Sequence, residues 1–284
     1  MSDFLGYVVA GTALGCTIAL LASGFVVVHR VTGVVNFAQG MFPVVAGLAA
    51  GSLLSANWPH GVAEIGGVLL AGAVGLLVGV VAIGKRGTPP LASLVITFGL
   101  GFLGYAIEIV IWGDQPRGFD GLSGVLTVGG VRIQHQWLLV MAVAAATFAA
   151  LGAFFGRTYL GKGLTACASN PYAARLAGID VRRMGFYAFA LAGLLGGLAG
   201  VLLTPLQSIA FDRDVALAVN GFAAAVLGGL DRPGAALAGG LLLGVGQTLF
   251  AGYVDGSFQT EVALAFMVLV MVVRATRQRE AMAV

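Results

Sequence analysis

Apolar runs of about 20 residues recur along almost the whole chain, and the charged residues gather in the short segments between them. A helix of about 20 apolar residues matches the thickness of the hydrocarbon core of a bilayer. The pattern therefore predicts a bundle of 8–10 membrane-spanning helices. We count nine candidate spans, at residues 4–28, 41–54, 62–84, 91–112, 137–156, 184–204, 216–229, 234–252 and 258–273.

The second of these spans is short, and its start is irregular. It follows a semi-polar segment, residues 31–40, and it carries Asn36, Gln39 and Pro43 in or next to it. Unpaired polar groups are costly in hydrocarbon, so irregular backbone at membrane depth lies against protein or a cavity. We expect this span to be broken or re-entrant.

Composition agrees with an all-α polytopic membrane protein. Hydrophobic residues make up 59% of the 284 residues and charged residues only 10%, against about 25% in ordinary soluble domains. The mean hydropathy is +0.98. We predict a single transmembrane domain over residues 1–284, with two longer polar loops at 113–136 and 157–183. Within the first loop, residues 125–133 alternate around two glycines and predict a small hairpin.

The basic residues orient the chain, because cytoplasmic loops of membrane proteins carry an excess of Lys and Arg. If the loop at 157–183 is cytoplasmic and the spans alternate, twelve of the fifteen Lys and Arg fall on that side. The predicted N-terminus is then outside, the C-terminus cytoplasmic and the 113–136 loop outside. The net charge of +3 therefore indicates topology and not nucleic-acid binding.

The cytoplasmic loop contains a short helix with both ends marked. Asn170 is a good N-cap, Pro171 suits the first helical position and Gly178 suits the left-handed residue after the end. Asp180 can cap the span that follows. A rigid basic helix between two spans is typical of a docking site for another protein. The predicted docking segment consists of Asn170, Pro171, Tyr172, Ala173, Ala174, Arg175, Leu176, Ala177 and Gly178.

Two glycine patterns resemble nucleotide-binding motifs without fitting them. Gly156, Gly161 and Lys162 nearly match a phosphate-binding loop, but Gly163 replaces the Ser or Thr that holds magnesium. The dinucleotide-like spacing that begins at Gly99 lies inside a predicted span. No cluster has metal spacing and no nucleophile has a base, so we predict no enzymatic activity and no bound cofactor or metal. Glycines four residues apart, such as Gly240 and Gly244, predict close helix packing instead.

Polar residues inside spans are candidates for contact with a solute. For Asn36 and Gln39, support of the loosened backbone and solute contact remain equally open. A solvated interfacial carboxylate is the favoured interpretation of Glu108, and a solvated outer loop that of residues 212–214. A helix–helix hydrogen bond is favoured for Asn220 and Gln247. The candidate pathway residues are Asn36, Gln39, Glu108, Asn220 and Gln247.

Three stretches resemble the permease subunits of bacterial ABC importers for branched-chain amino acids, specifically the shorter of the two permeases. Residues 32–40 are similar to the early "VVNFAHG" segment of that family, with Gln39 in place of the commoner His. Residues 168–179 resemble its cytoplasmic loop. Residues 227–235 resemble its late glycine turn, although Asp231 and Arg232 depart from the usual small residues.

The resemblance implies an inner-membrane importer subunit with defined partners. It implies a second permease subunit, most simply as a heterodimer, two ATP-binding subunits that hold ATP and Mg, and a periplasmic solute-binding protein. The docking segment would then contact an ATPase. The cargo would be branched-chain or other amino acids.

Other functions remain open from the sequence alone. Relatives of this family carry urea and short amides, and the chain could be a permease of that kind. A secondary transporter or channel without a motor is a second class, although no span carries an acid–base relay suited to proton coupling. A membrane anchor or assembly subunit is a third.

Overall fold

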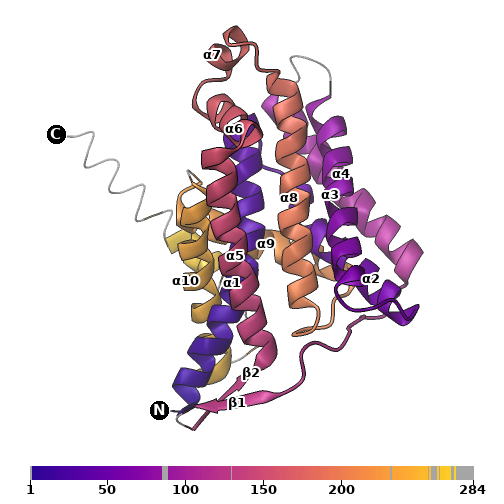
Figure 1. The fold of residues 1–284 in the computed structure, drawn as a ribbon, viewed down its shortest axis with the longest axis vertical. Helices are drawn as coiled ribbons and strands as arrows, with labels where there is room; N and C mark the ends of the chain where they lie inside the picture. Colours follow the sequence, from indigo (N-terminus) through magenta and orange to yellow (C-terminus); the bar gives the residue numbers. More distant parts are fainter. Residues whose placement is uncertain are drawn as a thin grey trace, which may run out of the picture.

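The chain forms a helical bundle in the computed structural model, which describes residues 2–84, 89–128, 130–230, 232–254, 256, 261, 263–269 and 272 (Figure 1). A short two-stranded sheet closes one end of the bundle. The elements are α1 (Ser2–Thr32), η1 (Phe37–Gly40), α2 (Met41–Ser55), α3 (Val62–Ile83), α4 (Pro90–Trp112), β1 (Val125–Val128), β2 (Val131–Gln134), α5 (His135–Arg157), α6 (Tyr159–Ser169), α7 (Pro171–Leu176), α8 (Val181–Leu203), η2 (Phe211–Arg213), α9 (Asp214–Gly228) and α10 (Pro233–Tyr253).

Seven helical segments of the described chain are long and apolar enough to cross a membrane, which confirms the fold class. They are α1, η1 continued by α2, α3, α4, α5, α8 and α10. The eighth predicted span is the 15-residue helix α9, which at about 1.5 Å per residue is too short to cross the core alone. The ninth prediction, 258–273, lies partly outside the described residues.

Helix α1 is the axis around which the bundle packs. It lies against α5, α8, α9 and α10, and its middle is enclosed on all sides, with Leu20 and Phe25 almost inaccessible. Helix α3 packs against α2 and α8 on the other side of the bundle. Helix α4 is peripheral, and its only buried residues are Ser93, Thr97 and Glu108.

Glycines allow the closest helix crossings, as their spacing predicts. A Cβ added to Gly244 of α10 would lie 2.3 Å from the Cα of Gly15 in α1. A Cβ on Gly193 of α8 would lie 2.3 Å from the carbonyl oxygen of Ala71 in α3. The obstacles are backbone atoms, so the helices would have to separate to accept a side chain.

The predicted hairpin forms, and it is tied to the bundle by a contact that the sequence does not predict. β1 and β2 pair antiparallel, with Val125 opposite Gln134. In addition, Arg117 and Ile209 exchange two backbone hydrogen bonds of 2.8 Å each. This bridge joins the 113–136 loop to the segment between α8 and α9.

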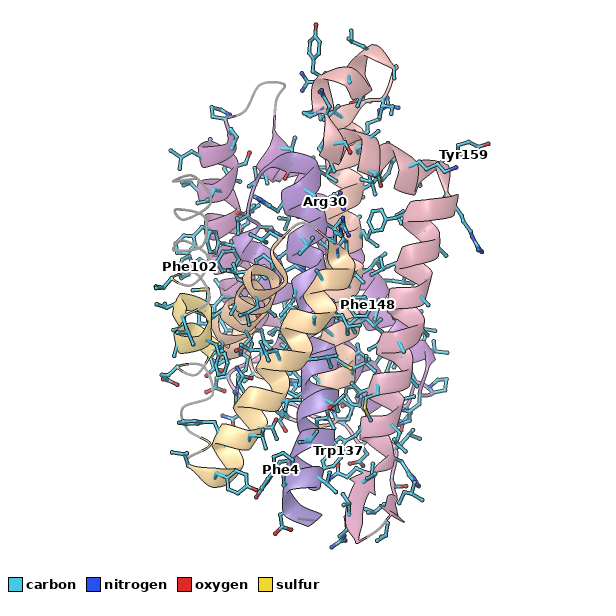
Figure 2. All side chains as sticks on the ribbon, turned by 90° about the vertical axis from the view of Figure 1, so that its left-hand side faces the viewer. Phe4, Arg30, Phe102, Trp137, Phe148 and Tyr159 are labelled. Carbon is cyan, nitrogen blue, oxygen red and sulfur yellow. The ribbon has the colours of Figure 1, made fainter. Side chains whose placement is uncertain are left out.

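The 157–183 loop is more ordered than predicted. The sequence predicts one short helix here, but an additional helix, α6, precedes it. The Thr158 hydroxyl caps α6 by accepting a hydrogen bond from the Gly161 amide, and Leu164 and Cys167 face the bundle. Helices α6 and α7 lie at the opposite end of the bundle from the β-hairpin (Figure 1). Tyr159, the first residue of α6, and Trp137, near the start of α5 and close to the hairpin, mark these two ends (Figure 2).

Candidate functional site

The irregular entry to α2 is stabilised by two fully buried amides. After α1 the chain turns at Gly33, where φ is +70°, and then passes through η1. The Asn36 side chain accepts a hydrogen bond from the Ala38 amide (3.1 Å) and donates one to Gln39 (3.3 Å). Gln39 donates in turn to the carbonyl of Ala192 in α8 (3.1 Å). Both side-chain amides are inaccessible to solvent, and each forms a hydrogen bond with a backbone group.

One face of α4 packs against this irregular segment. Ser93, Thr97, Gly101, Gly104 and Glu108 recur at intervals of three or four residues, so they form one stripe. The Thr97 hydroxyl accepts a hydrogen bond from the Phe37 amide (3.3 Å). The small and polar stripe of α4 therefore faces η1, while the apolar side chains of α4 point outward.

Glu108 is buried, and the expectation of a solvated carboxylate is wrong. Its side chain is 1% exposed and lies beside the carboxyl group of Asp214, which is 7% exposed. The prediction that residues 212–214 lie in a solvated loop is also wrong for Asp214, because that residue begins α9 inside the bundle. The four carboxyl oxygens have no hydrogen-bond donor among the described residues. Two buried acidic groups thus face each other without a cation.

An apolar cavity of about 560 Å³ adjoins this carboxyl pair. It opens between α4, η1 and α9, and Asp214 is its one acidic wall residue. Aromatic rings and a thioether dominate its walls, and Phe98 and Phe102 are more than half exposed. The aromatic and thioether side chains of the wall are Phe37, Met41, Phe98, Phe102, Tyr105 and Phe222.

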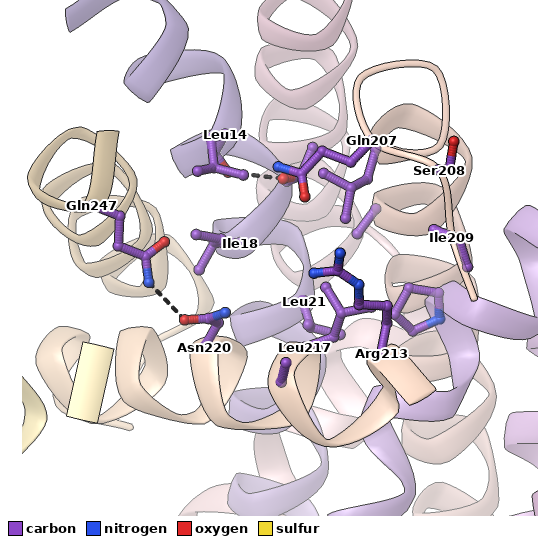
Figure 3. Close-up of a pocket in the computed structure, with 15 residues that line it drawn as sticks. Leu14, Ile18, Leu21, Gln207, Ser208, Ile209, Arg213, Leu217, Asn220 and Gln247 are labelled. Carbon is purple, nitrogen blue, oxygen red and sulfur yellow. Dashed lines mark hydrogen bonds between the residues drawn. The ribbon is translucent and has the colours of Figure 1, made fainter. Parts of the chain in front are cut away.

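A second, smaller cavity of about 70 Å³ lies on the other side of α9 (Figure 3). The Gln247 amide donates a 2.7 Å hydrogen bond to the Asn220 oxygen, which confirms the predicted contact between α10 and α9. Arg213 points into this cavity (Figure 3). An engineered cavity of about 150 Å³ holds benzene, so this smaller space suits a few water molecules.

The predicted docking segment has the local structure that the sequence predicts. Asn170 accepts hydrogen bonds of 3.0 Å from the amides of Tyr172 and Ala173. At the other end Gly178 has a φ of +82°, and the Ile179 amide donates to the Ala174 carbonyl (3.0 Å). These are the hydrogen bonds of a Schellman motif. The helix is thus fixed at both ends.

Only one side of α7 is held by the bundle. Ala174 is 4% exposed and packs in a cluster with Ile179, Cys167 and the end of α1. Tyr172 and Leu176, by contrast, are 69% and 75% exposed. The segment therefore presents large apolar side chains and Arg175 to the space beyond the bundle.

The nucleotide-like glycine patterns lie in helices. Gly156 is in α5 and Gly161 is in α6, so no extended loop is present to surround a phosphate. Gly99 is in α4. Among the described residues there is no group of three or more His, Cys, Asp or Glu side chains that could hold a metal ion.

Comparison with known proteins assigns the chain to a family. Residues 7–275 match the family described as the permease component of the branched-chain amino acid transport system. The chain belongs to this permease family.

The permease's relatives are transport subunits. It is 27% identical over 290 residues to the high-affinity branched-chain amino acid transport system permease protein LivH of Salmonella typhimurium, covering 96% of this chain and 94% of that protein. It is 27% identical over 292 residues to BraD of Pseudomonas aeruginosa, with the same coverage. It is also 32% identical over 226 residues to the L-arabinose ABC transporter permease AraH of Azospirillum brasilense, covering 75% of this chain. The permease is therefore a multi-pass membrane transport component and not an enzyme.

Proposed function

We propose that this permease forms part of the membrane pathway of an ABC importer for branched-chain amino acids. The observation that carries the proposal is the family match over nearly the whole chain. The proteins named for branched-chain amino acid transport match almost their full length, whereas the arabinose permease matches 62% of its own. Amino acids are therefore favoured over sugars as cargo.

The proposed assembly contains a second permease subunit, two ATP-binding subunits and a periplasmic solute-binding protein. ATP and Mg would be bound by the ATP-binding subunits. The exposed apolar side of α7 supports contact with one of them, because a capped helix with Tyr172 and Leu176 uncovered can dock without first becoming ordered. The orientation proposed from the basic residues puts α7 in the cytoplasm and the N-terminus outside.

The direct test is transport by the purified assembly. The permease would be co-expressed with candidate partner subunits, reconstituted into proteoliposomes and supplied with radiolabelled leucine, valine, urea or L-arabinose. We expect uptake of leucine and valine that requires both ATP and the binding protein. Uptake of leucine without ATP would instead support a motor-independent transporter. Uptake of urea or arabinose alone would contradict the proposed cargo.

A further inference from the structure

Glu108 and Asp214 form a buried acidic pair for which the described part of the protein supplies no counter-charge. Two ionised carboxylates only accept hydrogen bonds and repel each other, so without a cation at least one of the two must keep a proton. Leaving charged groups buried and unpaired is expensive. The ion pairs of the described residues involve Glu64 and Asp180 and neither member of this pair.

The neighbouring charges do not relieve this arrangement. Asp212 adds a further negative charge near Asp214, and Arg213 turns into the smaller cavity. The first turn of α9 favours an acidic residue through its dipole, yet its amides do not hydrogen-bond the Asp214 oxygens. The pair is thus suited to receiving a positive charge from outside the chain.

The cavity beside the pair has the chemistry of a site for an apolar ammonium compound. Aromatic faces attract cations, and the same rings with Met41 offer an apolar surface for an aliphatic chain. Its volume of about 560 Å³ is several times the roughly 150 Å³ that accommodates benzene. The cavity also lies between η1 and the start of the short helix α9. Irregular backbone and interrupted helices of this kind surround solute sites in transporters.

We infer that this cavity binds the cargo, with the ammonium group of a branched-chain amino acid at Asp214 and its side chain among Phe98, Phe102 and Phe222. This inference rests on the proposed function for the identity of the cargo. Asp214 on the cavity wall gives the ammonium group an acceptor, and the acidic group of Glu108 lies directly behind it. The aromatic walls cover the aliphatic chain.

The test is ligand protection of a thiol placed in the cavity. Val215 lines the cavity and is 65% exposed, and Val215→Cys changes little in volume. The native Cys16 and Cys167 are buried, and burial raises the pKa of the Cys167 thiol, so both provide a low labelling background. The complete importer in nanodiscs would be labelled with a maleimide in the presence of leucine, 3-methylbutylamine or 4-methylpentanoate.

Leucine and 3-methylbutylamine are expected to slow the labelling of Val215→Cys, whereas 4-methylpentanoate, which lacks the ammonium group, is not. Adding Asp214→Asn or Glu108→Gln should raise the concentration for half-protection about tenfold or more, the effect of losing a charge-assisted hydrogen bond. The matched control is Asp120→Asn, because Asp120 is an exposed acid in the 113–136 loop and does not line the cavity. It should leave protection unchanged.

Several outcomes would overturn the inference. Equal protection by 4-methylpentanoate would show that the ammonium group is not recognised. Unchanged protection in both Asp214→Asn and Glu108→Gln would indicate that the two carboxyl groups share a proton with each other and do not bind the ammonium group. A thiol that is unreactive before any ligand is added would indicate that a partner subunit covers the cavity. Leucine uptake by the same complex, measured in parallel, separates these failures from failure of the proposed function.

Discussion

At the scale of single residues, local chemistry was predictable and burial was not. The caps at Asn170, Gly178 and Asp180 follow from rules that act within four residues, and each forms as predicted. The burial of Glu108 follows from tertiary packing that puts it beside Asp214, more than 100 residues away in the chain. The sequence does contain a signal for this burial. Glu108 continues the helical spacing of Ser93 and Thr97 and so belongs to the polar stripe of α4.

Replacement of Gln39 should test the amide network at the same scale. Gln39→Leu leaves the Asn36 amide and the Ala192 carbonyl without their partner inside the bundle. Unsatisfied buried polar groups cost about 1–3 kcal/mol each, so we expect the free energy of unfolding in mixed detergent micelles to fall by at least that amount. Gln115→Leu, at an exposed position in the 113–136 loop, should change the free energy of unfolding by less than about 0.5 kcal/mol. Equal effects of the two substitutions would mean that the network does not stabilise the fold.

At the scale of elements, periodicity located the helices because each span must satisfy its own backbone in the membrane. The structure places α3, α5 and α8 close to the predicted ranges. Features that depend on contacts distant in sequence were missed, such as the bridge between Arg117 and Ile209. Helix α6 was missed because its buried face is narrow and is covered by α5 and α8.

The crossing of α1 and α10 offers a test at this scale. Gly244→Ala puts a methyl group against the backbone of Gly15, and overpacking of this kind costs typically 1–3 kcal/mol. Gly99→Ala is the matched control, since a Cβ there has nothing within 4 Å. Alanine is favoured over glycine in a helix interior by about 1 kcal/mol, so this control should be neutral or stabilising. The comparison uses the same unfolding measurement. If Gly99→Ala lowered the free energy of unfolding and Gly244→Ala did not, the close crossing of α1 and α10 would be contradicted.

At the scale of the whole molecule, the two ends of the bundle have opposite expected locations. The hairpin end carries Thr127 and the α6–α7 end carries Leu176, and both side chains are exposed. In intact cells a membrane-impermeant maleimide should label Thr127→Cys, whereas Leu176→Cys should be labelled only after the membrane is opened. The reverse pattern would invert the proposed orientation and place the docking segment outside.

We expect force to pass between the bundle and an ATP-binding subunit through α7. Ala174 is unsuitable as a probe, because its burial against Ile179 means that a charge there would disturb α7 itself. Leu176→Glu instead introduces a charge on the uncovered side of α7. Charged groups are disfavoured in the core of an interface, so we expect ATP-dependent uptake to fall at least tenfold and the stimulation of ATP hydrolysis by the loaded binding protein to be lost.

Tyr159→Glu is the matched control for this experiment, because Tyr159 is 95% exposed at the same end of the bundle but lies on α6. Both variants should keep the unfolding free energy of the unmodified protein, since neither side chain is packed. If Leu176→Glu retains normal uptake, α7 does not transmit the motion. If both variants lose uptake equally, the contact extends over α6 as well. A loss confined to Leu176→Glu would link docking to α7, whose two caps keep it rigid enough to move the attached helix α8 as one body.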